Sequence, residues 1–181
     1  MKIRIKKMRE NAKLPEFKNG NWADVYVSQI GKVDRFTLSL GGEFDFKKDV
    51  DWYDENSTNL IPYEAGDALV FKLGFALELP KGKELHLLPR SGTFRKYGLI
   101  LTNSMGIGDD TFVGNEDEYL AVMYATRIGS VKVGDRLIQI KIENAMPKYE
   151  FEEVETFGDV PSRGGYGTTG RWFNESRSRF T

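Results

Sequence analysis

The sequence predicts an all-β protein, a sandwich or a barrel, and three observations support this class. Short segments alternate apolar and polar residues with a period of two, the pattern of a strand with one buried face. Glycine, proline and asparagine separate these segments at roughly ten-residue intervals, which is typical of strands joined by turns. No segment shows the periodicity of a helix of three turns. Many short strands at even spacing favour a sandwich or barrel over a parallel α/β sheet.

The strands can be justified in chain order. The first is expected at 1–7, where Ile3 and Ile5 alternate with basic residues, and the last at 136–142, where three isoleucines share one face. The segment 69–79 is long enough for one or two strands. The other strands are expected at 23–30, 35–40, 85–88, 97–102 and 119–124. A short helix is expected near 90–97.

Two regions fit a barrel less well. Residues 41–63 are acidic and loop-like, and they lie in an insertion at about 31–64. Residues 157–181 are rich in Gly, Ser, Thr and Arg and hold too few apolar residues to fold alone. The predicted organisation is a β-barrel domain over 1–156 and a flexible, glycine-rich C-terminal arm over 157–181.

Composition excludes several classes of function. The 181 residues hold 26 Lys and Arg against 27 Asp and Glu, so the chain lacks the basic excess of a nucleic-acid binder. Without cysteine it forms no disulfide, thiolate zinc site or cysteine nucleophile, and its single histidine, His86, excludes a His-rich metal site. No apolar run has the length of a signal peptide or a membrane span. We therefore expect a soluble protein of the cytoplasm, or of the host cytoplasm if the chain is phage-encoded.

The segment PRSG follows a predicted strand and contains residue types that bind phosphate. Arg90 offers a fork of donors, Ser91 adds a hydroxyl, and Gly92 lets the backbone approach a ligand closely. On local evidence, an ordinary junction between a strand and a turn is the favoured interpretation of these four residues.

The segment NSMGIGDDTFVG, residues 103–114, lies between two apolar strands and is expected to form a hairpin. Asp109 and Asp110 are adjacent carboxylates, and Phe112 follows them. A carboxylate near an apolar ring can serve as a general base. Aspartate is also common in turns for geometric reasons, and on local evidence that interpretation is favoured.

Three further segments carry candidate residues. NWADV places Asp24 at the start of a strand, and GDRLIQ places Gln139 on the polar face of another. GGYGTTG matches a dinucleotide-binding pattern by letter, but no strand precedes it and too few residues follow. Its glycines and threonines can still wrap phosphates, and Tyr166 can stack on a base, but on local evidence an unstructured tail is the favoured interpretation.

Taken in chain order, these five segments resemble the motifs of the homotrimeric dUTPase (dUTP diphosphatase) family. The resemblance covers the chain from about Lys2 to Gly170, and the insertion is similar to elaborations of phage and bacterial members. It implies a jelly-roll-like β-barrel that assembles as a homotrimer, with active sites at the subunit interfaces. It implies hydrolysis of dUTP to dUMP and pyrophosphate, by attack of water at the α-phosphate with Mg²⁺ on the triphosphate.

The resemblance also implies roles for individual residues. Asp109 would orient and deprotonate the water, and Phe112 would lie under the deoxyribose and exclude a 2′-hydroxyl. Asn103 and the hairpin backbone at Gly106 would bind uracil, and Asp24 would support the water shell of the metal.

Phosphate contacts would come from Arg90, Ser91, Gly92 and Gln139. The arm of a neighbouring subunit would close over the site and contribute Arg163, Tyr166, Gly167, Thr168 and Thr169, with Arg171 as a rival to Arg163.

The sequence departs from the family pattern near the expected active site. Gly108 stands where isoleucine is usual, and Phe112 and Val113 replace a tyrosine and a basic residue. Glu116 and Asp117 make the hairpin unusually acidic. They either help to hold the metal or are simply solvated, and solvation is the favoured interpretation.

Two alternatives remain open at the level of the sequence. A dCTP deaminase of the same fold would need a hairpin glutamate near the pyrimidine C4, for which Glu116 and Glu118 are available. A non-catalytic, nucleotide-gated regulatory protein would use the acidic insertion as a surface for a protein partner. The expected partners are otherwise dUTP and further copies of the chain, with no nucleic acid and no membrane.

Overall fold

The structure is a computed structural model that describes residues 2–33 and 45–164. The chain divides into two compact units, Met1–Pro147 and Lys148–Thr181. All helices and strands of the described residues lie in the first unit, and residues 148–164 contain neither. The predicted boundary between a domain over 1–156 and an arm over 157–181 stays a prediction.

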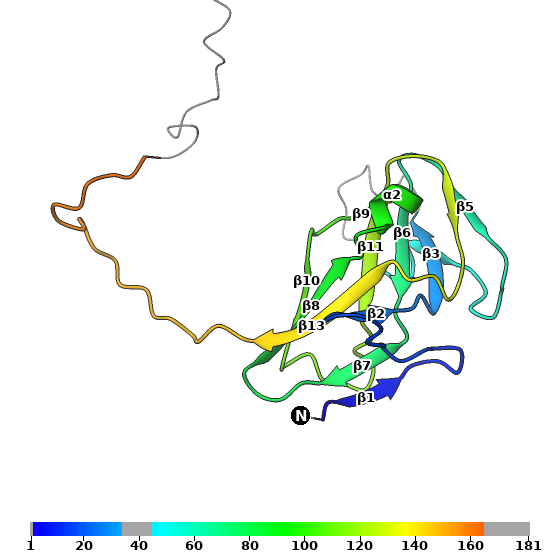
Figure 1. Cartoon of the computed structure of the whole chain (residues 1–181), viewed down its shortest axis with the longest axis horizontal. Coiled ribbons are helices and arrows are strands. Elements are labelled where there is room, and N and C mark those ends of the chain that lie inside the picture. The colour runs from blue at the N-terminus through cyan, green and yellow to red at the C-terminus, as the bar shows by residue number, and fades with distance from the viewer. Residues whose placement is uncertain (1, 34–44, 165–181) are drawn as a thin grey trace, which may run out of the picture. The chain divides into compact units, whose positions relative to one another are not determined.

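Two antiparallel sheets form most of the first unit, which confirms the all-β class (Figure 1). The five-stranded sheet has the order β4 (Val50–Trp52), β3 (Gln29–Val33), β6 (Ala68–Lys72), β11 (Leu120–Ala125), β9 (Leu99–Leu101). The four-stranded sheet has the order β10 (Gly106–Asp109), β8 (Lys83–Pro89), β13 (Ile138–Asn144), β2 (Ala23–Val25).

Two strand pairs and one short helix complete the unit. The pairs are β1 (Arg4–Lys7) with β7 (Phe75–Glu78), and β12 (Gly129–Val131) with β5 (Ile61–Tyr63). The helix α2 (Thr93–Tyr97) confirms the short helix expected near 90–97. Figure 1 shows β1 and β7 at one end of the unit and α2 at the other.

The core lies between the two main sheets and follows the period-two pattern. Leu85 and Leu87 of β8 are buried, whereas His86 between them points outward and pairs with Glu84 at 2.6 Å. Phe71 of β6 and Ile138 of β13 are fully buried in the same cluster. Alternation along each strand therefore fixes which side chains face the core.

Two predicted strands are each split by a change of sheet. The segment 23–30 divides into β2 and β3, and the segment 69–79 divides into β6 and β7. At the second break Gly74 has φ +77°, and a Cβ there would lie 2.5 Å from the Cβ of Ala12. Only glycine fits this turn, because it tolerates positive φ and fills no space. The strand expected at 35–40 lies outside the described residues.

The expectation that residues 41–63 are loop-like was wrong in part. β4 pairs with β3 at the edge of the five-stranded sheet, and β5 pairs with β12. Val50 is buried, and Tyr63 is fully buried with its hydroxyl donating to the carbonyl of Tyr97 at 2.6 Å. The two strands were not predicted, because each has only three residues and acidic residues surround them.

The simple hairpin expected at 103–114 was also wrong. β9 and β11 pair with each other, as a hairpin requires, but their connection contains a further strand, β10. β10 leaves the five-stranded sheet and pairs with β8 of the other sheet. The connection thus carries Asp109 from one sheet to the edge of the other.

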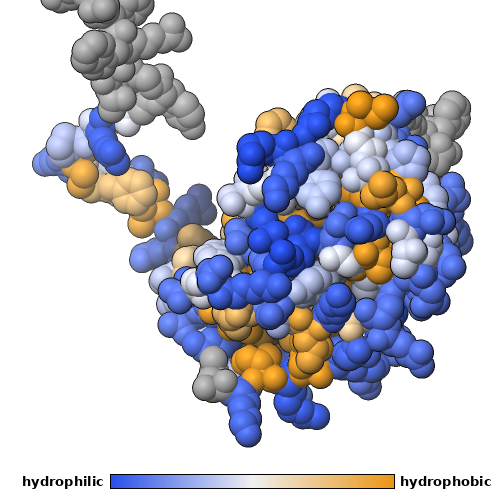
Figure 2. Space-filling view, turned by 45° about the vertical axis from the view of Figure 1, so that its right-hand side comes forward, coloured by the Kyte–Doolittle hydropathy of each residue, from blue (hydrophilic) through white to orange (hydrophobic). Residues whose placement is uncertain are grey.

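The surface of the first unit carries apolar side chains near β1 and β7. A groove there is lined by Ile3, Ile5, Leu14, Phe17 and Leu77 among others, and Phe17 is 70% exposed. Figure 2 shows apolar surface gathered at this end of the unit. No helix of the described residues is long and apolar enough to cross a membrane.

Candidate active site

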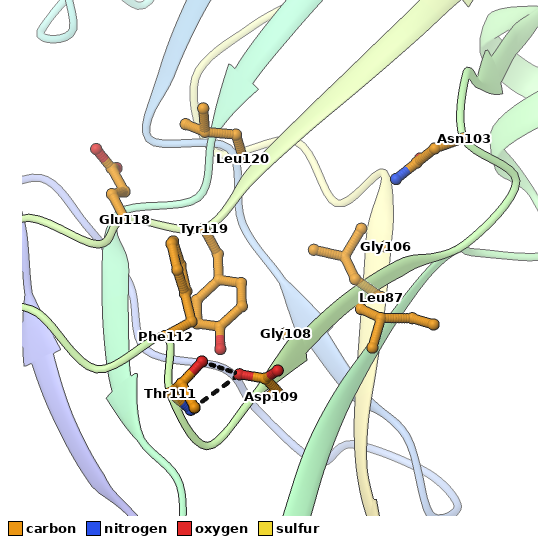
Figure 3. Close-up of a pocket in the computed structure, with 11 residues that line it drawn as sticks. Leu87, Asn103, Gly106, Gly108, Asp109, Thr111, Phe112, Glu118, Tyr119 and Leu120 are labelled. Carbon is orange, nitrogen blue, oxygen red and sulfur yellow. Dashed lines mark hydrogen bonds between the residues drawn. The ribbon is translucent and has the colours of Figure 1, made fainter. Parts of the chain in front are cut away.

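A pocket of about 460 Å³ lies where β10 and the segment after it meet β8 and β11. Four of the predicted site residues line it: Asn103, Gly106, Asp109 and Phe112. Figure 3 shows Asn103 at one side of the pocket and Phe112 at the other, with Asp109 at its lower edge. The turn before β10 holds Ser104 at φ 60°, an uncommon conformation for a residue other than glycine.

Asp109 is the last residue of β10 and is exposed at the pocket. One of its carboxylate oxygens, Oδ1, accepts hydrogen bonds from the backbone N–H of Thr111 at 2.9 Å and from its hydroxyl at 2.5 Å (Figure 3). These local bonds fix the turn that follows the strand. They also hold the carboxylate in one orientation at the edge of the pocket.

Two aromatic rings form one wall of the pocket. Phe112 is 37% exposed and meets Tyr119 edge-on, with 5.2 Å between ring centroids. Tyr119 is 6% exposed and also packs against Phe75 of the core, at 5.5 Å. Burial, and after it the charges of Asp109 and Asp117, raise the pKa of Tyr119 to about 12. Tyr119 is therefore a neutral phenol at neutral pH.

The sequence did not single out Tyr119 as a site residue. The signal that points to it is the glycine at position 108, where the family pattern has isoleucine. A Cβ at Gly108 would lie 2.6 Å from the Tyr119 ring and hydroxyl. The phenol therefore fills space that a side chain at 108 would otherwise occupy.

Glu118 also lines the pocket, but it is held by other groups. Its side chain is 10% exposed, forms an ion pair with Arg9, and accepts a hydrogen bond from the N–H of Gly74 at 2.9 Å. Arg9 in turn binds Glu55 of the insertion at 2.7 Å. Arg9 thus joins the insertion to the wall of the pocket.

A second pocket, of about 410 Å³, gathers the other predicted residues of the first unit. Asp24, Arg90, Ser91 and Gln139 all line it, together with the basic residues Lys18 and Arg136. Gly92 lies next to it, as the residue that precedes α2. The lining of this pocket contains three cationic side chains and one carboxylate, so it suits a ligand with several negative charges.

Asp24 organises this basic pocket. Its Oδ1 binds Arg90 Nε at 2.6 Å, and its Oδ2 binds Arg136 Nη1 at 2.8 Å. Both arginines are about one-third exposed, so their guanidinium groups are oriented by Asp24 yet still face solvent. Arg136 was not among the predicted site residues, although it lies within the GDRLIQ segment.

The two pockets are separated along β8. Asp109 pairs in register with Glu84 near one end of this strand, whereas Arg90 follows Pro89 at its other end. Five residues of strand span roughly 16 Å. The structure therefore places Asp109 and Arg90 of one chain in different pockets.

The structure describes only Arg163 among the predicted residues of the arm. Arg163 is exposed in the second unit. Tyr166, Gly167, Thr168 and Thr169 lie outside the described residues, as does Arg171.

Asp24 is the described residue that was predicted to contact a metal ion, through water. Within residues 2–33 and 45–164, no group of three or more His, Cys, Asp or Glu side chains lies close enough to hold a metal ion. Mg²⁺ commonly keeps several waters and binds through substrate phosphates and one or two carboxylates. A carboxylate offers about four acceptor sites. Asp24 can therefore bind its two arginines and still accept a hydrogen bond from a metal-bound water.

No family model matches the chain. Among curated proteins, the chain is similar to a prophage-derived deoxyuridine 5′-triphosphate nucleotidohydrolase of Bacillus subtilis (strain 168). The two are 38% identical over 120 residues, and the aligned region covers 66% of this chain and 84% of that protein. The chain is 25% identical over 171 residues to the corresponding enzyme of Crocosphaera subtropica, spanning 94% of this chain and 99% of that one.

Solved structures share the fold. The dUTPase of Staphylococcus bacteriophage 80alpha, a mutant with dUpNHpp, matches with a TM-score of 0.65 at 17% identity, over 94% of this chain and 99% of that one. The dUTPase of phage phi11 of S. aureus, described with a structural Mg(II) ion, matches with a TM-score of 0.61 at 16% identity, over 87% and 99%. The likeness to these structures confirms the jelly-roll-like fold class. Because the chain is also 38% identical to the prophage enzyme, it belongs to the deoxyuridine 5′-triphosphate nucleotidohydrolase (dUTPase) family.

Proposed function

We propose that this chain is a dUTP diphosphatase, which hydrolyses dUTP to dUMP and pyrophosphate. One observation carries the proposal: the chain is 38% identical to a prophage deoxyuridine 5′-triphosphate nucleotidohydrolase over 84% of that protein. The phage 80alpha structure, with the nucleotide dUpNHpp, supports the same substrate class. The proposed compartment is the cytoplasm, or the host cytoplasm for a phage-encoded chain.

The proposed mechanism gives Asp109 the role of general base. Its carboxylate accepts a proton from a water molecule as that water attacks the α-phosphorus. The bond from this phosphorus to the bridging oxygen breaks, and pyrophosphate leaves. Asn103 and the backbone at Gly106 would bind the uracil, and Phe112 would lie under the deoxyribose.

The triphosphate would lie in the basic pocket. Arg90 and Arg136 would neutralise its charge, and Asp24 would hold both guanidinium groups in place. Ser91, Gly92 and Gln139 would add neutral contacts to the phosphates. A bound Mg²⁺ would supply further neutralisation of the triphosphate. Asp24 would accept hydrogen bonds from the waters of that ion.

We also propose a homotrimer whose active sites are each built from more than one chain. The support is the separation of Asp109 and Arg90 into two pockets of one chain. A second copy could bring its basic pocket next to the Asp109 pocket of the first. The arm would contribute Arg163 and residues 166–169 to a neighbouring site.

The alternative activity, deamination of dCTP, has less support. It needs a glutamate able to exchange protons at the pyrimidine ring. Glu118 is bound by Arg9 and the N–H of Gly74, and Glu116 is 91% exposed and lies 3.8 Å from Lys6 Nζ. A protein partner for the insertion stays a prediction, since residues 34–44 lie outside the described part.

The test is release of pyrophosphate, with Mg²⁺, from dUTP, dCTP, dTTP and UTP by wild type and by Asp109→Asn. We expect wild type to act on dUTP alone. Asp109→Asn should fold normally and lose about 10²–10⁴ in turnover, the usual contribution of a general base. Asp110→Asn is the matched control, because Asp110 lies outside the pocket and accepts a hydrogen bond from the N–H of Gly82.

Three outcomes would contradict the proposal. If wild type released no pyrophosphate from any of the four nucleotides, the diphosphatase activity would be excluded. Ammonia release from dCTP would then favour the deaminase activity. Full turnover of Asp109→Asn would remove Asp109 from the mechanism. An equal loss in Asp110→Asn would show that the change acts through the turn rather than through the base.

A further inference from the structure

The hydroxyl of Tyr119 is buried at the wall of the Asp109 pocket without a partner. The residue is 6% exposed, and its hydroxyl oxygen has no hydrogen-bond partner among the described residues. A buried polar group that lacks a partner destabilises the folded state, and such groups are rare in native proteins. Phenylalanine would fill the same space without this penalty. The hydroxyl therefore needs an explanation outside folding.

The chain makes room for this phenol at the residue before Asp109. A Cβ at Gly108 would lie 2.6 Å from both Cε1 and the hydroxyl oxygen of Tyr119, closer than real Cβ contacts allow. Position 108 must therefore be glycine for Tyr119 to lie across β10. The close approach of Tyr119 to Gly108 places a phenol beside β10, the strand that ends at Asp109.

The hydroxyl points toward the side of the pocket where Asp109 lies. Figure 3 shows it directed to the end of the pocket occupied by Asp109 and Thr111, and away from Leu120. The charge of Asp109 is one of the causes that keep the phenol protonated. At neutral pH the group that faces Asp109 is therefore an O–H donor, and a carboxylate accepts several hydrogen bonds at once.

We propose that Tyr119 is a positioning residue, whose hydroxyl donates a hydrogen bond to the Asp109 carboxylate when a nucleotide fills the pocket. This inference rests on the proposed function of Asp109 as general base. Phe112 provides the link, because it is partly exposed in the pocket and meets Tyr119 edge-on at 5.2 Å. A sugar packed on Phe112 would press its ring against Tyr119 and bring the hydroxyl to the carboxylate. The bond would aim the base at the attacking water.

The test is a double-mutant cycle on dUTP hydrolysis with Tyr119→Phe and Asp109→Ala. Tyr119→Phe should lower kcat about tenfold, as expected for the loss of a hydrogen bond to a charged group, with little change in KM. In the Asp109→Ala background, the same substitution should have no further effect, since the acceptor is absent. The urea midpoint of Tyr119→Phe should equal or exceed that of wild type.

The matched control is Tyr124→Phe, which removes a hydroxyl from β11, the strand that begins just after Tyr119, on a side chain that is 42% exposed. It should keep wild-type kcat. Wild-type kcat in Tyr119→Phe would overturn this inference alone, as would an equal loss with and without Asp109. A wild type that is inactive on dUTP would overturn the proposed function and this inference together.

Discussion

Asp24 shows how one carboxylate can organise a site for an anionic ligand. It is buried, and each of its oxygens binds a different arginine, at 2.6 and 2.8 Å. Its negative charge attracts both arginines and so offsets the repulsion between Arg90 and Arg136, while both remain accessible to a ligand. Hydrogen bonds between ionised groups are stronger than neutral ones, so this geometry is well defined before a ligand binds.

Tyr119 gives a prediction for stability at high pH. Its pKa is raised from 10.0 to about 12 in the folded chain, mainly by burial. Above pH 10 the unfolded chain loses this proton while the folded chain keeps it, so stability falls as the pH rises toward 12. Urea unfolding at about pH 8 and pH 11 should show that wild type loses roughly 1.4 kcal/mol more than Tyr119→Phe.

The comparison of wild type with Tyr119→Phe isolates the contribution of Tyr119 to the loss of stability. Burial also raises the pKa values of Tyr63 and Tyr97, but both residues are present in the two proteins. An equal loss of stability in the two proteins would contradict the burial of Tyr119 described here.

At the scale of elements, the C-terminal arm is predicted to act as a lid. Residues 157–181 are rich in Gly, Ser, Thr and Arg, and a lid that closes over bound substrate would exclude water from the reaction. Deletion from Ser162 onward should leave the oligomeric mass and melting temperature unchanged, yet lower kcat/KM for dUTP by about 10² or more. Light scattering and steady-state kinetics measure the two effects.

The matched control for the arm is deletion from Trp172 onward, which keeps the glycine-rich segment and Arg171. This shorter deletion should retain most activity. Full activity after deletion from Ser162 would show that the arm has no part in the reaction.

Strands with a clear period of two could be predicted from the sequence, and the elements it missed lack that pattern for physical reasons. β8, β11 and the first half of β13 alternate buried residues with more exposed ones, and these strands were predicted. β10 has the sequence GIGD, in which two glycines remove the apolar face. β4 has only three residues in an acidic region and is stabilised by its pairing with β3, a contact distant in sequence.

The candidate site was predictable only as separate motifs. The spacing of the motifs led to Asp24, Arg90, Asn103 and Asp109, but not to the two pockets that contain them. Arg136 reaches Asp24 across a sequence separation of 112 residues, through the pairing of β13 with β2. Tyr119 was not predicted, because its position at the pocket depends on the space that Gly108 leaves by having no side chain. Local sequence does not specify either contact.

At the scale of the whole molecule, assembly would explain two features of a single chain. The Asp109 pocket and the basic pocket are lined by different residues, although the proposed reaction would use both. Side chains such as Phe17 and Leu14 also expose apolar surface near β1. A symmetric oligomer would bury such surface and bring complementary pockets together.

We propose that neighbouring chains together build the sites in which dUTP is hydrolysed. The most direct measurement is pyrophosphate release from dUTP by mixed oligomers of Asp109→Asn and Arg90→Gln, formed by co-expression and checked by native mass spectrometry. Each variant alone should be nearly inactive. In a mixed cyclic trimer, about a quarter of the sites combine an intact Asp109 with an intact Arg90 from different chains, so activity should recover to about that fraction. Activity no higher than the average of the two separate variants would contradict the account, because each site would then belong to one chain.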